Sequence, residues 1–211
     1  MSPPTLWNYD LDDACYRVRL MAALAGLELR LRSVDAVPGN EPRGPEMMAL
    51  NPLGRLPLFR SGDLLLRQTE AILLHVARAA PGGSAFLPAG EALRAEMEDW
   101  LLFAATELAV ARAARRVALF EGDQTPLPAL REKAAAALTI LEDHLAEQRA
   151  RGLPFVAGEA ASVADIALFP AFALSNDFHL AHATFPALRL WAREIRALEG
   201  FVTMPGIPAF H

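Results

Sequence analysis

Few side chains in this sequence could carry out chemistry, and its single cysteine is the first to consider. Cys15 cannot form an internal disulfide or a zinc site of several thiolates, because both need further cysteines. A thiol with a lowered pKa can still act as a nucleophile, so Cys15 is a candidate for thiol chemistry. The five histidines show no ligand spacing beyond His179 and His182. We interpret these two as surface residues and predict no metal site.

Charge and composition argue against several classes of protein. The 211 residues are 53% hydrophobic, the net charge is -5, and the basic residues are scattered, so we expect no nucleic-acid partner. The most basic stretch, Ala109–Val117, places Arg112, Arg115 and Arg116 on one helix face, which we interpret as a solvated face or the rim of a ligand site. The sequence starts without a signal-peptide pattern and has no run of ~18 apolar residues. We therefore expect a cytoplasmic protein with no membrane partner.

Residues 1–80 show patterns of alternating strands and helices. A strand is predicted over Thr5–Tyr9 and a helix over Cys15–Ala25. Leu27, Leu29 and Leu31 then alternate with polar residues, which predicts a half-buried strand.

The next segment is rich in proline and glycine and predicts an irregular path, with one helical turn over Glu46–Leu50. Two strands, Leu56–Phe59 and Leu64–Leu66, flank a predicted hairpin turn, and an amphipathic helix follows over Gln68–Ala80. The first 80 residues therefore read β-α-β, an irregular segment, and β-β-α.

The remainder of the chain is predicted to be helical after a linker over Pro81–Gly90. One long apolar stripe covers Glu91–Phe120, and helices are predicted over Pro128–Ala150 and Phe185–Glu199. Ser162 and Asp165 form a capping pattern before an apolar run, which predicts another helix start.

This order of elements resembles the cytosolic glutathione S-transferases, in which an α/β thioredoxin-like domain precedes an all-α domain. The motifs that support the resemblance are "NPLGRLPLF" (Asn51–Phe59), "LLLRQTEAILLHVA" (Leu64–Ala77), "FVAGEAASVADIALFP" (Phe155–Pro170) and "FPALRLWAREIRALEGF" (Phe185–Phe201). The resemblance implies a glutathione-binding domain over residues 1–80, a linker over 81–90, and a helical domain over 91–211 that forms the second-substrate site.

The resemblance also implies a glutathione site. The bond before Pro57 would be cis, and the backbone of Leu56 would pair with the cysteinyl unit of glutathione like an added strand. Gln68 and Thr69, at the start of a helix where the dipole favours anions, would hold the γ-glutamyl group. Arg55 could lie near a carboxylate of the ligand.

The sequence departs from the family at the catalytic position. The family places Ser, Cys or Tyr there, whereas alignment puts Asp12 in the Ser/Cys position and Asn8 in the Tyr position. An ionised Asp12 facing the sulfur at ~4 Å would repel a thiolate by ~4 kcal/mol, which would raise the thiol pKa by ~3 units. Asp12 could instead cap the helix and leave the thiolate to backbone amides or Asn8. Tyr9 or Cys15 could also act, although Tyr9 would point to the other face of a strand, and a buried, inert Cys15 is favoured.

The resemblance implies that the first long helix contributes to the second-substrate site. Its candidates are Thr106, Glu107, Arg112 and Phe120, while we assign Trp100 and Phe103 to core packing. We expect a homodimer that conjugates glutathione to a small apolar electrophile, in a detoxification role. The alternatives are a non-catalytic binding or scaffold protein and a glutathione-dependent isomerase, dehalogenase or thiol-redox enzyme.

Overall fold

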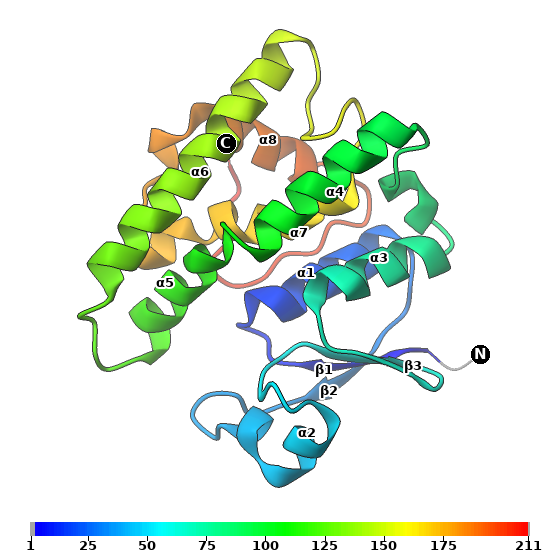
Figure 1. Ribbon diagram of the computed structural model, residues 1–211, viewed down its shortest axis with the longest axis vertical. Helices are drawn as coiled ribbons and strands as arrows, with labels where there is room; N and C mark the ends of the chain where they lie inside the picture. Colours follow the sequence, from blue (N-terminus) through cyan, green and yellow to red (C-terminus); the bar gives the residue numbers. More distant parts are fainter. Residues whose placement is uncertain (1–2, 211) are drawn as a thin grey trace.

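A four-stranded sheet organises the first part of the chain (Figure 1). The computed structural model describes residues 3–210. The strands are β1 (Thr5–Asn8), β2 (Arg30–Ser33), β3 (Leu58–Ser61) and β4 (Leu64–Leu66). Their order is β2-β1-β3-β4; β1 runs parallel to β2 and antiparallel to β3, and β3 and β4 form a hairpin.

Helices lie on both sides of this sheet. Helices α1 (Asp13–Leu24) and α3 (Thr69–Ala79) pack against each other on the side that faces the second half of the chain, and α2 (Pro45–Leu50) lies on the opposite side (Figure 1). This is the thioredoxin-like arrangement that the sequence predicted.

The second half of the chain is helical. Its helices are α4 (Glu91–Ala105), α5 (Ala109–Phe120), α6 (Leu127–Ala150), α7 (Val163–Ala173) and α8 (Pro186–Arg196), with short 3-10 helices at Gly83–Phe86, Ser175–Phe178 and His182–Thr184. Every residue of α7 is buried, because the helix is surrounded by α4, α8, α1 and α3. None of the described helices is both long and apolar enough to span a membrane.

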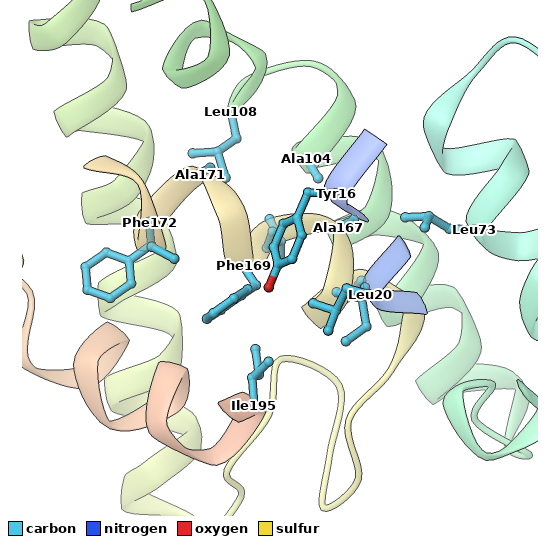
Figure 2. Close-up of a cluster of buried hydrophobic side chains, with 14 of the residues drawn as sticks. Tyr16, Leu20, Leu73, Ala104, Leu108, Ala167, Phe169, Ala171, Phe172 and Ile195 are labelled. Atoms are coloured by element: carbon cyan, nitrogen blue, oxygen red, sulfur yellow. The ribbon is translucent and has the colours of Figure 1, made fainter. Parts of the chain in front are cut away.

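One continuous apolar core joins the two halves of the chain. Tyr16 and Leu20 of α1 and Leu73 of α3 lie beside Ala167 and Phe169 of α7, as Figure 2 shows. All five side chains are buried, so the position of the helices relative to the sheet is fixed by apolar packing.

The predicted capping pattern at the start of α7 is confirmed. Ser162 is the residue before the helix, and its side chain and that of Asp165 form a reciprocal capping box. Asp165 also accepts hydrogen bonds from the Val156 amide and the Trp191 indole, at 3.1 and 2.8 Å, so the helix start is linked to α8 as well.

Two predictions about the elements were wrong, one of them in part. Leu27 and Leu29 are half-buried against the core, as predicted, but the strand β2 starts only at Arg30, lies at the edge of the sheet and is exposed throughout, with Leu31 50% exposed. The apolar stripe over Glu91–Phe120 does not form one helix, because Thr106 adopts a non-helical conformation (φ -110°, ψ -81°) and separates α4 from α5. This break changes which side chains α5 can present to a ligand.

Candidate active site

A cavity of about 550 Å³ lies between the two halves of the chain. Its walls come from the loop after β1, the start of α1, the segment before α2, the residues before β3, and α5. The lining residues are Tyr9, Leu11, Asp12, Asp13, Ala36, Val37, Asn40, Pro42, Arg43, Gly54, Arg55, Leu56, Ala109, Arg112, Ala113, Arg115, Arg116, Phe120 and Glu121.

The main chain of Leu56 forms part of the cavity wall. The bond between Leu56 and Pro57 is cis, as the resemblance implied. The Leu56 amide has no protein acceptor in the described part of the chain, and its carbonyl receives only a long hydrogen bond of 3.4 Å from Arg112 Nη2. Buried Asn51 supports this loop by donating to the Arg55 carbonyl at 2.7 Å. Leu56 therefore offers a backbone donor and acceptor to a ligand.

Asp12 acts as a helix cap and as an ion-pair partner. Its Oδ1 accepts from the Cys15 amide at 2.8 Å at the start of α1. Its Oδ2 lies 2.6 Å from Nη2 of Arg112, a residue of α5 one hundred positions further along the chain. The alternative in which Asp12 caps the helix is therefore observed. In addition, the positive charge of Arg112 offsets the negative charge of Asp12, a pairing that the sequence did not predict.

Arg112 is the centre of the charged part of the cavity. Besides Asp12, it contacts Asp13 through Nε at 3.1 Å, and Asp13 in turn lies 3.5 Å from buried Arg17. Burial by itself would lower the pKa of the Arg112 guanidinium, but Asp12 and Asp13 raise that pKa above its ordinary value. Arg112 therefore remains charged at every relevant pH.

Two expectations about the end of β1 were wrong. Asn8 is not a cavity residue: it is buried, its amide donates to Asp10 at 2.8 Å, its carbonyl accepts from Arg19, and it is absent from the cavity lining. Tyr9 does line the cavity, with its ring 6.4 Å from that of Phe120. The strand ends at Asn8, so strand alternation does not govern the direction of Tyr9.

Cys15 is buried and lies outside the cavity. Its side chain is 0% exposed, and its Sγ donates to the Trp7 carbonyl at 3.7 Å. Burial raises the pKa of the Cys15 thiol, and the charge of Asp12 raises it further. Because a thiolate is needed for nucleophilic or redox chemistry, the structure disfavours Cys15 as a reacting group.

The state of Cys15 gives a first testable prediction. In the folded protein at neutral pH, Cys15 should react with an aromatic disulfide reagent at least ~100-fold more slowly than in urea, since burial blocks access and keeps the thiol protonated. The absorbance of the released aryl thiol measures both rates. Equal rates in the two conditions would show that this thiol is accessible.

Gln68 and Thr69 lie beside the cavity rather than on its wall. Gln68 is the exposed residue before α3, and its Oε1 accepts from Arg55 Nη2 at 3.1 Å. Thr69 is buried and is the first residue of the helix, so it is not the cap itself. Arg55, which lines the cavity, therefore connects Leu56 to the start of α3.

The expected second-substrate residues are divided by the break between α4 and α5. Arg112 and Phe120 line the cavity, but Thr106 and Glu107 do not; Thr106 is exposed and donates to its own helix at the Leu102 carbonyl. We predicted these positions from one continuous helix, and the non-helical conformation at Thr106 turns them away. Trp100 packs against the core, as expected, with its ring centre 5.1 Å from that of Phe103.

The basic face of α5 was only partly predicted. Arg116 is exposed and pairs with Glu121 at 3.0 Å, as a solvated residue should. Arg115, however, is buried; it contacts Asp177 at 2.7 Å and donates to the Leu11 carbonyl at 2.6 Å. The solvated alternative is therefore wrong for Arg115, because the loop after β1 and the segment after α7 cover it. The other alternative, the rim of a cavity, agrees with the structure, since Arg112, Arg115 and Arg116 all line the cavity.

The histidines form no metal centre in the part of the chain that the structure describes, where no three His, Cys, Asp or Glu side chains are grouped for a metal ion. The two ring nitrogens of half-buried His182 contact the Phe172 carbonyl and the Asn176 side chain. His182 is therefore not a fully exposed surface residue, as we had interpreted it, but a half-buried one with two hydrogen-bond partners.

A thioredoxin-like sheet, a helical second half and a cavity between them define a class of two-part proteins with a candidate ligand site between the halves. The model for "Glutathione S-transferase, N-terminal domain" matches residues 2–78, and the model for "Glutathione S-transferase, C-terminal domain" matches residues 77–194. The chain therefore belongs to the glutathione S-transferase family.

Individual relatives agree with this assignment. The chain is 28% identical to glutathione S-transferase 3 of Zea mays over 99% of its own length and 96% of that protein. A possible glutathione S-transferase from Rhodopseudomonas palustris superimposes with a TM-score of 0.86 at 28% identity, covering 98% of this chain and 92% of that one. A glutathione transferase homologue from Lodderomyces elongisporus, solved with two glutathione molecules per subunit, shares the fold at 23% identity, with a TM-score of 0.83 and coverage of 95% and 96%.

Proposed function

We propose that this protein binds glutathione in the cavity and conjugates it to a small apolar electrophile, as a cytoplasmic homodimer without a metal cofactor. The single observation that supports this most is the Leu56 main chain, which presents a free amide and a weakly bonded carbonyl to a cavity of about 550 Å³ in a chain of this family. A tripeptide can pair with such a backbone as an additional strand. The structure of the Lodderomyces elongisporus homologue with bound glutathione supports the choice of ligand.

The ends of the tripeptide would be held by polar groups near Leu56. In the proposed mode, the γ-glutamyl group reaches the start of α3, where unpaired backbone amides favour a carboxylate. Because Gln68 Oε1 is occupied by Arg55, its NH₂ group is left to donate to the ligand. Arg55 and Arg43 line the cavity and add positive charge for a tripeptide that carries two carboxylates.

An apolar part of the cavity would receive the second substrate. Tyr9 and Phe120 form an aromatic wall, and Ala109 and Ala113 leave space along the face of α5. A planar or small apolar electrophile could pack against these side chains next to the thiol. The wall therefore fits the class of substrate that the family suggests.

A test of the glutathione site uses Gln68→Ala with two ligands. Removing one hydrogen bond to a carboxylate should weaken glutathione binding ~10-fold or more, since such a bond contributes ~1.5–3 kcal/mol. Cysteinylglycine lacks the γ-glutamyl group, so its weaker binding should be unchanged. Titration calorimetry of both ligands with both proteins gives four binding free energies, and from them the interaction energy between the Gln68 side chain and the γ-glutamyl group. A Gln68→Ala protein that binds glutathione as tightly as the wild type would place the γ-glutamyl group elsewhere.

A non-catalytic glutathione-binding protein is the second candidate. Its support is the aspartate at position 12, where the family has a hydroxyl or thiol donor, because an ionised carboxylate can only accept hydrogen bonds. Turnover of 1-chloro-2,4-dinitrobenzene, followed by product absorbance, separates the two candidates. Binding without measurable conjugation would favour the binding protein, and absence of glutathione binding would exclude both.

A further inference from the structure

We propose that Arg112 is a catalytic residue that stabilises the thiolate of bound glutathione, in place of the hydroxyl or thiol that the family usually has at the position of Asp12. This inference rests on the proposed function, since it needs glutathione in the cavity. It assigns the activating group to the helical half of the chain and gives Asp12 a positioning role.

The position of the guanidinium supports this assignment. Arg112 Nη2 lies 2.6 Å from Asp12 Oδ2 and 3.4 Å from the Leu56 carbonyl. Leu56 is where the cysteinyl unit would pair, and Asp12 is where the sulfur would point. One cation therefore contacts both groups that define the expected place of the thiol.

The guanidinium also has hydrogen-bond donors to spare. An arginine has five N–H donors; Nη2 donates to Asp12 and to Leu56, and Nε lies within ion-pair distance of Asp13. Nη1 has no partner among the described residues, and the Arg112 side chain is 32% exposed while lining the cavity. Its two N–H groups are available for a charge-assisted hydrogen bond to a thiolate.

The other charged groups around the cavity are worse placed for this role. Arg115 is bonded to Asp177 and Leu11, Arg116 to Glu121 and Arg55 to Gln68, while Arg43 contacts neither Asp12 nor Leu56. Within the described residues, Arg112 is the only side chain that is hydrogen-bonded to both Asp12 and Leu56.

Tyr9 is the one hydroxyl that competes for the sulfur. Its ring lies against Phe120, which follows Arg112 by eight residues, or ~12 Å along α5. Among the described residues the Tyr9 hydroxyl forms no hydrogen bond with Asp12, Leu56 or Arg112, whereas Arg112 contacts both Asp12 and Leu56.

The acids beside Arg112 hold it in place. Asp12 and Asp13 contact it at Nη2 and Nε, and Arg17 lies 3.5 Å from Asp13 and 3.5 Å from Glu70. These five groups carry three negative and two positive charges, so the thiolate depends on direct contact with the guanidinium. At Nη1 its nearest charge is a cation, because Asp12 and Asp13 contact the other two nitrogens.

The chemical step follows from this placement. The S–H bond of glutathione breaks, its proton passes to water, and the electron pair left on sulfur is stabilised by Arg112. That pair then forms a carbon–sulfur bond with the electrophile, while the leaving group departs with the electrons of its own bond.

The test is the thiol pKa of glutathione bound to wild-type protein and to Arg112→Gln, from thiolate ultraviolet absorbance against pH. S-methylglutathione, which has no thiol, provides the blank. We expect a wild-type value below that of free glutathione and an increase of ~1–3 units in Arg112→Gln, because an opposite charge within 4–6 Å shifts a pKa by this amount. Arg78→Gln, which removes an exposed charge at the far end of α3, should leave the bound pKa unchanged.

Each outcome decides the proposal. An unaltered pKa in Arg112→Gln, or a wild-type value at or above that of free glutathione, would overturn it, as would an increase found in Tyr9→Phe instead. If Arg112→Gln does not fold, Arg112→Lys replaces it. A lysine keeps the positive charge but loses the planar guanidinium with its several N–H donors. The conjugation rate should then fall ~10-fold or more, while the thiol pKa of bound glutathione stays below that of free glutathione. Full wild-type activity in Arg112→Lys would then overturn the role of Nη1. Failure of the proposed function is recognised separately, because glutathione and S-methylglutathione would both fail to bind the wild-type protein.

Discussion

Replacing Asp165 by alanine is expected to lower the free energy of unfolding by ~3–5 kcal/mol. The carboxylate is fully buried and accepts from the Val156 and Ser162 amides, the Ser162 hydroxyl and the Trp191 indole, at distances of 2.7–3.1 Å. Alanine would leave these donors without an acceptor, and each unpaired buried donor costs ~1–3 kcal/mol. The effect is large because α7 is the helix around which both halves of the chain pack (Figure 2).

Urea unfolding followed by circular dichroism measures this loss. Asp143→Ala is the control, since Asp143 is an exposed aspartate on α6, and its removal should change stability by less than ~0.5 kcal/mol. Asp165→Asn keeps one side-chain oxygen and should lie between the two. Equal stability of the Asp165→Ala and Asp143→Ala proteins would show that the hydrogen bonds of the capping box contribute little.

Replacing Arg115 by methionine is expected to destabilise the protein by ~3 kcal/mol, although the adjacent Arg116→Met should cost only ~0.5 kcal/mol. Both arginines form an ion pair, at 2.7 and 3.0 Å, but the Arg115 side chain is 6% exposed and that of Arg116 is 63% exposed. Methionine keeps most of the apolar stem, so the difference reports the charge and hydrogen bonds. Without Arg115, Asp177 and the Leu11 carbonyl would lose the hydrogen bonds that Arg115 donates to them.

The pair of adjacent arginines makes this a matched comparison on one helix. Urea unfolding of both variants gives the two changes in free energy, and the difference should exceed ~2 kcal/mol. Similar values for the two variants would mean that burial does not strengthen the Arg115 pair. A further readout is glutathione affinity, which should fall in Arg115→Met because Leu11 and Asp12 are neighbours on the cavity wall.

Much of the fold could be predicted because its signals are local. The helix over Pro128–Ala150, the capping box at Ser162 and the hairpin at Gly62 each depend on residues within a few positions of one another. Hydrophobic spacing and turn residues specify such elements directly. The errors, exposed Leu31 and the break at Thr106, occurred where the position of an element in the whole molecule decides the outcome.

The candidate site shows the same difference between what local patterns predict and what the whole molecule decides. The sequence, through its resemblance to the family, was enough to name Leu56, Pro57, Gln68 and Thr69 as site candidates, since they lie in two short motifs, and it showed that Asp12 departs from the family.

Only the tertiary structure placed Arg112 against Asp12, buried Arg115 against Asp177, and turned Tyr9 into the cavity. These contacts join residues 62 to 100 positions apart, or depend on where a strand ends, and no local pattern encodes them. The charge that offsets Asp12 comes from the other half of the chain, so it exists only once the common core has fixed both halves together.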